Sequence, residues 1–331
     1  AVKWGEKMIA VHNLCKTFRV AKRNAGLKEA WKALFRREHE IVHALEDVSF
    51  TIEDGEMIGY IGPNGAGKSS TIKILSGILT PDSGTCIVNG RVPWKERRAH
   101  VSEIGVVFGQ RSQLFWDVPV IDTFELLKEV YRIPERKYKS NLDRLVALLD
   151  LKDILRTPTR QLSLGQRMRC EIAASLLHSP KILFLDEPTI GLDATAKIAV
   201  REFIKTINRE QKTTVILTTH DMQDIEALTE RILLIGRGRI LLDGTLSDLK
   251  ERYSETKTVI IKYRGDHFLL PDGAKVVERI NGHATVAVNV KEVSASAVIS
   301  SIVNQVEVQD ISVQDISLDK LVVELYKEFQ I

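Results

Sequence analysis

One segment has the residue types and spacing of a phosphate-binding loop: Gly62, Pro63, Asn64, Gly65, Ala66, Gly67, Lys68 and Ser69, with Ser70 following. Glycines let backbone N–H groups turn toward phosphate oxygens, and the lysine adds positive charge for the β- and γ-phosphates. The Ser69 hydroxyl can ligate Mg²⁺. An apolar run over residues 57–61 predicts a strand before the loop, and residues 68–78 predict a helix whose positive end faces the phosphates. The segment therefore predicts a nucleotide site.

Polar side chains end three further apolar runs. Asp186 and Glu187 follow residues 182–185, and His220 follows the next run, residues 215–217. Ligands of parallel α/β sheets bind at the carboxyl ends of the strands, so these side chains are predicted to meet at the nucleotide. Asp186 would hold Mg²⁺, Glu187 would polarise the attacking water and His220 would contact the γ-phosphate. Gln110, after residues 106–109, could contact Mg²⁺ or the water.

A second turn suited to phosphate begins at residue 162 and reads Leu162, Ser163, Leu164, Gly165 and Gln166. A Ser-Gly-Gln turn that opens a helix offers backbone donors and a helix dipole to an anion. One chain cannot easily fold this turn onto its own phosphate loop. The turn therefore predicts an ATPase that works as a pair.

The strand and helix patterns predict an α/β fold with a parallel sheet. Residues 8–20 and 41–54 are β-rich, and residues 122–150 have helical periodicity. The last 80 residues alternate short strands with two helices, which indicates a small α+β domain. We expect a main domain over 1–250, with a helical part at about 111–178, and an accessory domain over 251–331.

Composition narrows the classes of function. The chain has 331 residues, 44% of them hydrophobic, and a net charge of +3, which gives no basis for nucleic-acid binding. It has no run of 18 apolar residues and no apolar signal core near its first residue, so we expect no membrane span. Three widely spaced cysteines suggest ordinary thiols in a reducing cytosol.

Together these motifs resemble the ATP-binding cassette (ABC) ATPases over roughly residues 8–250. Gly62–Ser69 is similar to the Walker A loop and Ile182–Glu187 to the Walker B strand. Residues 162–166 are similar to the family signature LSGGQ, Gln110 to the Q-loop, His220 to the switch histidine and Asp193 to the D-loop aspartate. Phe18 takes the place of the aromatic residue that stacks on adenine.

The resemblance implies a P-loop NTPase cassette with a mainly parallel core sheet, an N-terminal antiparallel β subdomain and a helical insert. It also implies that two cassettes, identical or paralogous, enclose two molecules of ATP with Mg²⁺. Ser163 and Gly165 of one cassette would contact the γ-phosphate held by the other, and Gln166 would also belong to the nucleotide-binding residues. The cassettes would lie at the cytoplasmic face of the membrane and drive separate permease subunits.

Two features depart from the family pattern. Leu164 replaces the first glycine of LSGGQ, so its side chain is expected to point away from the phosphate. A basic insertion over residues 21–40 follows Phe18, with Trp31, Leu34 and Phe35 at helical spacing. This segment suits either a helix on anionic lipid or a permease, or a solvated surface helix.

Among ABC functions the sequence favours transport. Only 118 positions separate Lys68 from Asp186, which leaves no room for the long coiled coil of chromosome-associated relatives, and one motif set argues against translation factors. Residues 186–193, the signature and the basic insertion resemble bacterial drug- and polymer-exporter cassettes. The alternatives are an importer cassette with a ligand-sensing C-terminal domain and, less favoured, a non-transport ABC ATPase. The tail would serve dimerisation or regulation.

Overall fold

The computed structural model describes residues 7–21, 39–109, 111–252, 256–265, 267–315 and 318–329. Two compact units are present, Ala1–Asp243 and Gly244–Ile331. The boundary between the units falls within the strand Arg239–Thr245. The change in sequence pattern predicts the boundary slightly later, at residue 250. The helix expected in the basic insertion lies outside the described residues, because 22–38 are not among them.

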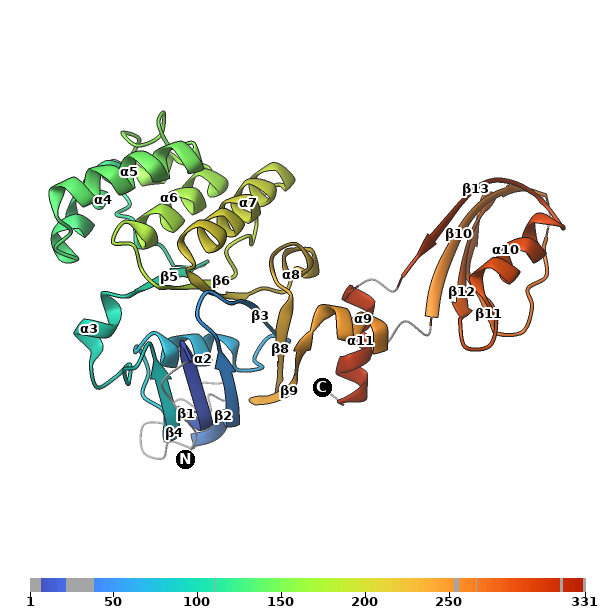
Figure 1. Cartoon of the computed structure of the whole chain (residues 1–331), viewed down its shortest axis with the longest axis horizontal. Helices are drawn as coiled ribbons and strands as arrows, with labels where there is room; N and C mark the ends of the chain where they lie inside the picture. The colour runs from blue at the N-terminus through green and yellow to red at the C-terminus, as the bar shows by residue number, and fades with distance from the viewer. Residues whose placement is uncertain are drawn as a thin grey trace, which may run out of the picture. The chain divides into compact units, whose positions relative to one another are not determined.

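A six-stranded sheet forms the centre of the first unit, in the order β5-β6-β7-β3-β8-β9 (Figure 1). The five strands from β5 to β8 in this order pair in parallel. Apolar runs without alternation form these parallel strands because both faces of the sheet are covered there. The strands are β3 (Met57–Ile61), β5 (Ile104–Phe108), β6 (Ile182–Asp186), β7 (Thr214–Thr218), β8 (Arg231–Gly236) and β9 (Arg239–Thr245).

A smaller antiparallel sheet contains the N-terminal strands, in the order β2-β1-β4. Helix α2 (Lys68–Leu75) contacts both β2 and β6, so it links the two sheets of the unit. The expected class of fold, an α/β cassette with an N-terminal antiparallel subdomain, is confirmed. The strands of this sheet are β1 (Ile9–Ala21), β2 (His39–Ile52) and β4 (Ser83–Val88).

The helical insert lies between β5 and β6, and the stretch over residues 122–150, where the sequence pattern predicts one helical run, lies in two helices, α4 (Val120–Val130) and α5 (Glu135–Leu149). The break follows from Arg132, which has a φ of 53°, and from Pro134, which caps the second helix. The remaining helices of the unit flank the central strands (Figure 1). Besides α2, the helical segments of the first unit are α3 (Arg97–Val101), α4 (Val120–Val130), α5 (Glu135–Leu149), a 3₁₀ turn (Thr159–Gln161), α6 (Leu164–Leu176), α7 (Ala194–Gln211) and α8 (Met222–Leu228).

The second unit contains a four-stranded antiparallel sheet in the order β11-β12-β10-β13. Alternate residues of β10 and β12, such as Val259, Ile261 and Val286, are buried in one core with Val298 and Ile302 of α10. The elements are α9 (Leu246–Arg252), β10 (Thr256–Arg264), β11 (Ala274–Ile280), β12 (His283–Asn289), α10 (Ala295–Val303), β13 (Glu307–Gln314) and α11 (Leu318–Glu328). Within the described ranges of the chain, no helix is both long and apolar enough to span a membrane.

His178 joins the helical insert to the central sheet. Its ring stacks on Tyr131 at 4.0 Å between centroids, and its Nε2 donates to the Ile104 carbonyl at 2.9 Å. The ring is buried, and Nδ1 has no hydrogen-bond partner, so a second ring proton would lack an acceptor. Burial lowers the pKa of His178 to about 4.

This buried histidine predicts that acid weakens the fold. Between pH 7.5 and 5 the unfolded chain takes up a proton at residue 178 and the folded chain does not, so stability falls by about 2 kcal/mol. His178→Asn cannot titrate and should lose this part of the pH dependence, whereas His283→Asn, at an exposed site, should retain it. Urea unfolding at both pH values measures the difference. Equal pH dependence in the parent and His178→Asn would refute the assignment.

Candidate active site

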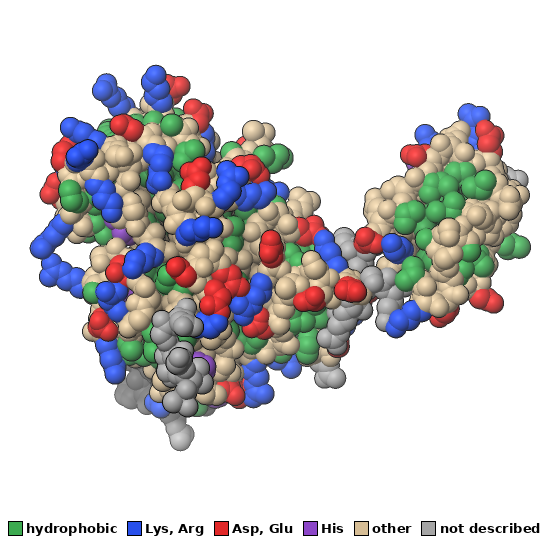
Figure 2. Space-filling model, in the orientation of Figure 1, with side chains coloured by type: hydrophobic (Ala, Val, Ile, Leu, Met, Phe, Trp, Pro, Cys, Tyr) green, Lys and Arg blue, Asp and Glu red, His purple; other side chains and the backbone are tan. Residues whose placement is uncertain are grey.

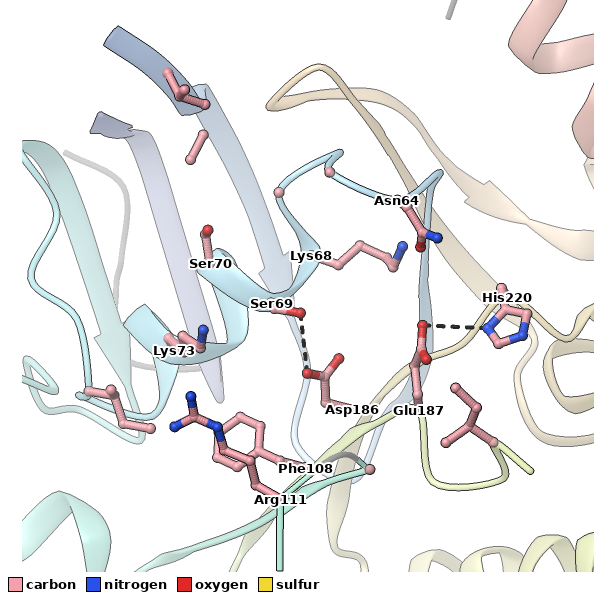
Figure 3. Close-up of a pocket in the computed structure, with 17 residues that line it drawn as sticks. Asn64, Lys68, Ser69, Ser70, Lys73, Phe108, Arg111, Asp186, Glu187 and His220 are labelled. Carbon is pink, nitrogen blue, oxygen red and sulfur yellow. Dashed lines mark hydrogen bonds and ion pairs between the residues drawn. The ribbon is translucent and has the colours of Figure 1, made fainter. Parts of the chain in front are cut away.

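A cavity of about 640 Å³ lies at the carboxyl ends of β3, β5, β6 and β7 (Figure 3). The parallel order of these strands brings together side chains that are far apart in the sequence. Nine predicted residues line the cavity: Asn64, Gly65, Gly67, Lys68, Ser69 and Ser70 of the loop and helix, and Asp186, Glu187 and His220 beyond them. The remaining lining residues are Val42, Ala44, Lys73, Ile78, Phe108, Gly109, Arg111 and Ile190.

The phosphate loop is closely packed at its first residue. A Cβ at Gly62 would lie 2.2 Å from the Ile235 carbonyl oxygen, so only glycine fits there. Gly67 has a φ of 114° and stands at the N-cap of α2, where the first helical N–H groups face the cavity. The strand, turn and helix therefore present the backbone donors that a phosphate requires.

Lys68 lies across the mouth of this loop. Its ammonium donates to the carbonyl oxygens of Gly62 at 2.6 Å and Pro63 at 3.1 Å. Burial lowers the pKa of Lys68, and the nearby carboxylates of Glu187 and Asp186 oppose that shift. The result is a largely buried cation that two loop carbonyls orient.

Asp186 and Ser69 form the part of the site that suits Mg²⁺. The Ser69 hydroxyl donates to Asp186 Oδ2 at 3.2 Å, and Thr218 Oγ1 donates to Asp186 Oδ1. Mg²⁺ is usually held by one or two carboxylates and phosphate oxygens rather than by a complete protein cage. No cluster of three or more His, Cys, Asp or Glu ligands exists within the described part of the chain. One hydroxyl and one carboxylate therefore fit a magnesium ion that is shared with a nucleotide.

The Glu187 carboxylate lies beside the His220 ring in the cavity, with 3.4 Å between Oε1 and Nδ1 (Figure 3). The backbone of Glu187 has a φ of 54°, and its N–H donates to the Thr218 carbonyl at 2.9 Å. A left-handed conformation at a non-glycine residue costs of order 1–3 kcal/mol and is often kept at functional sites. The strain turns the carboxylate from the strand end toward Lys68 and His220.

The predicted Q-loop glutamine, Gln110, lies outside the described residues. The segment directly after it is fixed by the buried carboxylate of Glu171 in α6. This carboxylate accepts hydrogen bonds from the Ser112 hydroxyl and, at 3.1 Å, from the Gln113 N–H. Burial raises the pKa of Glu171, against the Ser112 hydrogen bond that lowers it. The helix that begins at the signature therefore holds the end of the Q-loop.

Phe18 does not line the cavity, although its neighbour does. Phe18 of β1 is paired with Val42 of β2, so the two side chains lie on the same face of the small sheet. Val42 lines the cavity, and Lys16 Nζ lies 5.7 Å from the Phe18 ring centroid. Stacking of Phe18 on adenine stays a prediction.

The cavity also contains cationic residues that sequence reasoning missed. Lys73 comes from the last turn of α2 and Arg111 from the segment after β5 (Figure 3). A signal for Lys73 was available in the sequence, because it follows Ser69 by four residues and so lies on the same face of the helix. No sequence signal indicated Arg111, whose position depends on where the chain leaves β5.

The signature residues lie apart from this cavity, at the start of α6. Ser163 caps the helix: its Oγ accepts from the Gln166 N–H at 3.2 Å, and its N–H donates to Gln166 Oε1 at 2.9 Å. A hydroxyl that accepts one hydrogen bond can still donate another. Ser163, Gly165 and Gln166 are not among the residues that line the cavity.

Leu164 lies against the D-loop, residues 191–193, of its own chain. A Cβ at Gly191 would come within 2.8 Å of Leu164 Cδ2, and Gly191 has a φ of 70°. The next residue, Gly165, is equally close to α7, because a Cβ there would lie 3.0 Å from Ala196 Cβ. Asp193 caps α7 by accepting from the Ala196 N–H at 2.8 Å. The signature turn and the D-loop are therefore packed together at the starts of two helices.

Comparison with known proteins places this chain in a family. The ABC transporter family matches residues 45–190. The ABC transporter ATP-binding protein NatA of Bacillus subtilis is 32% identical over 217 residues, which are 66% of this chain and 88% of NatA. The chain belongs to the ABC transporter ATP-binding proteins. It is an ATPase, because ABC cassettes hydrolyse ATP.

A relative named for drug resistance and a relative named for import match about equally well. The daunorubicin resistance ATP-binding protein DrrA3 of Streptomyces coeruleorubidus is 35% identical over 207 residues, 62% of this chain and 65% of DrrA3. The methionine import ATP-binding protein MetN 2 of Enterococcus faecalis is 34% identical over 225 residues, 67% of this chain and 64% of MetN 2. Similarity thus identifies an ATP-binding subunit without giving a direction of transport.

The structure resembles a dimeric cassette. The ATP-binding cassette MJ0796, solved as a dimer in a post-hydrolysis state with ADP and Pi, superposes with a TM-score of 0.60 at 25% identity. The match covers 72% of this chain and 99% of MJ0796.

Proposed function

We propose that this chain powers export through separate permease subunits, by ATP-driven pairing of two cassettes. The observation that carries the pairing of two cassettes is the separation of the signature turn from the cavity. The donors of Ser163 and Gly165 lie at a helix start outside the cavity, while the loop, Asp186 and Glu187 line it. A second cassette would complete each site by bringing its own signature turn to the γ-phosphate.

In the proposed reaction, the backbone N–H groups of residues 64–69 and the Lys68 ammonium bind the phosphates of ATP. Ser69 and Asp186, with Gln110, would hold Mg²⁺, which supplies positive charge against the phosphate oxygens when bound. Glu187 accepts a proton from the attacking water. His220, beside Glu187, orients the γ-phosphate. Hydrolysis removes the contact between the γ-phosphate and the opposite signature turn, so the pair reopens.

Exposed apolar side chains on the helical insert support a permease contact. Phe115 and Trp116 are 53% and 54% exposed, and Val118, Leu126 and Val130 lie near them in the chain with 36% to 64% exposed. These residues follow the segment that Glu171 fixes, so a push on them reaches the end of the Q-loop. A peripheral position at the cytoplasmic face of the membrane follows from such a contact.

Trp116→Asp tests this contact. We expect binding to the permease to weaken by at least about 10-fold, because aromatic anchors at protein interfaces commonly contribute 2 kcal/mol or more. Stimulation of the ATPase by the reconstituted permease should fall, while hydrolysis by the isolated cassette stays at the parental rate. Val277→Asp, at another exposed apolar site in the second unit, is the control. Undiminished stimulation of Trp116→Asp would contradict the proposed docking surface.

Export and import are the two candidate directions of transport. Export is favoured by the likeness to DrrA3, by the sequence features shared with drug and polymer exporters and by the basic insertion. Import would be favoured if a solute-binding protein were encoded beside the permease, as the likeness to MetN 2 allows. The second unit would be a dimerisation or regulatory module in the first case and a ligand sensor in the second.

A further inference from the structure

A buried carboxylate lies beneath the two loops that carry Glu187 and His220. Asp224, in α8, is fully buried. Its Oδ2 accepts a hydrogen bond from Thr189 Oγ1 and another, at 3.3 Å, from Thr219 Oγ1. Thr189 follows Glu187 by two positions and Thr219 directly precedes His220, so one side chain holds both loops.

Arg201 of α7 balances the charge of this carboxylate. Its Nε donates to Asp224 Oδ1 at 2.6 Å, and the guanidinium is mostly buried. A buried charge is tolerated only when it is paired and hydrogen-bonded, so neither partner is replaceable alone. Asp224 therefore needs Arg201 in order to remain an acceptor for the two threonines.

A second ion pair repeats the link between the same two helices. Lys197, one turn before Arg201, donates to Asp221, which caps α8 through the Gln223 N–H at 3.0 Å. Helices α7 and α8 contact each other directly (Figure 1). The helix that begins at the D-loop thus holds the helix that follows His220 at two points.

We propose that Asp224, held by Arg201, positions Glu187 and His220 for hydrolysis through Thr189 and Thr219. The inference rests on the proposed role of Glu187 as general base. Asp224, Arg201 and Thr189 are positioning residues, since none of them lines the cavity. Their expected signature is a loss of turnover without a loss of ATP binding, because the phosphate loop is held by other contacts.

Thr189→Val tests the inference with little change in shape. The variant keeps the volume of the side chain and removes the hydroxyl that bonds to Asp224. We expect kcat to fall by about 10- to 100-fold, the range caused by small misplacements of catalytic groups, while KM for ATP changes by less than about threefold. Thr189→Ser retains the hydroxyl and should restore kcat. Thr206→Val, which removes an exposed hydroxyl from α7, should leave both constants unchanged.

Asp224→Asn supplies a second measurement, with exposed Asp153→Asn as its control. Asp224→Asn should lower kcat at least as much as Thr189→Val does. The thermal melt gives the fraction of folded protein, and kcat is calculated for that fraction. If Thr189→Val and Asp224→Asn keep the parental kcat per folded molecule while Glu187→Gln is inactive, the inference about Asp224 is wrong and the role of Glu187 as base stands. Parental hydrolysis by Glu187→Gln would instead refute the base assignment, and the inference would fall with it.

Discussion

Glu187→Gln is expected to lower the rate of ATP hydrolysis by about 100- to 10,000-fold, the usual contribution of a general base. The amide has nearly the shape of the carboxylate but cannot accept the proton of the attacking water. The backbone of Glu187 is held by the bond to Thr218, so the substitution should leave the strand end in place. Binding of ATP should persist, since the phosphate loop is unchanged.

Phosphate release gives the rate of this variant, and equilibrium binding of a fluorescent ATP analogue gives its affinity. Glu230→Gln is a matched control: it makes the same chemical change at an exposed site two residues beyond α8. Hydrolysis by Glu187→Gln within threefold of the parental rate would show that another group accepts the proton.

Lys68→Ala is expected to weaken ATP binding by at least about 100-fold, because hydrogen bonds to charged groups contribute about 1.5–3 kcal/mol each and Lys68 can make two. The Lys68 ammonium is already desolvated, and two loop carbonyls orient it. Binding a phosphate therefore requires little further desolvation free energy. Hydrolysis should be lost as a consequence.

Isothermal titration with ATP and Mg²⁺ measures the affinity of Lys68→Ala. Lys205→Ala removes an exposed ammonium from α7 and should bind ATP with the parental affinity. A Kd for Lys68→Ala within tenfold of the parental value would mean that the loop amides alone carry the phosphate, and the role given to Lys68 would be wrong.

The strand ends made most of this site predictable. Apolar runs that end in Asp186 and Thr218 form adjacent parallel strands, and parallel strands carry their final residues to one edge of the sheet. Glu187 and His220, which follow these strands, are therefore brought together by topology alone. The loop between β3 and α2 reaches the same edge because β3 lies beside β7.

Other features depend on packing that periodicity does not encode. The contacts of Asp224 with Thr189 and Thr219 join three segments whose proximity is settled only when α7 and α8 pack. Likewise, the Leu164 side chain reaches Gly191 because two helix starts meet, although the departure from LSGGQ was evident in the sequence. The nearest signal in the sequence for such contacts is a polar residue, such as Asp224, on the apolar face of a helix.

The central claim is that the signature turn of one chain completes the ATP site of another. Sedimentation of Glu187→Gln with saturating MgATP, compared with the double variant Ser163→Arg/Glu187→Gln, tests it most directly. Glu187→Gln should sediment at twice the mass of the chain, whereas the double variant should bind ATP and remain a monomer. Equal dimer formation by the two proteins, or a monomer for Glu187→Gln at saturation, would contradict the shared site.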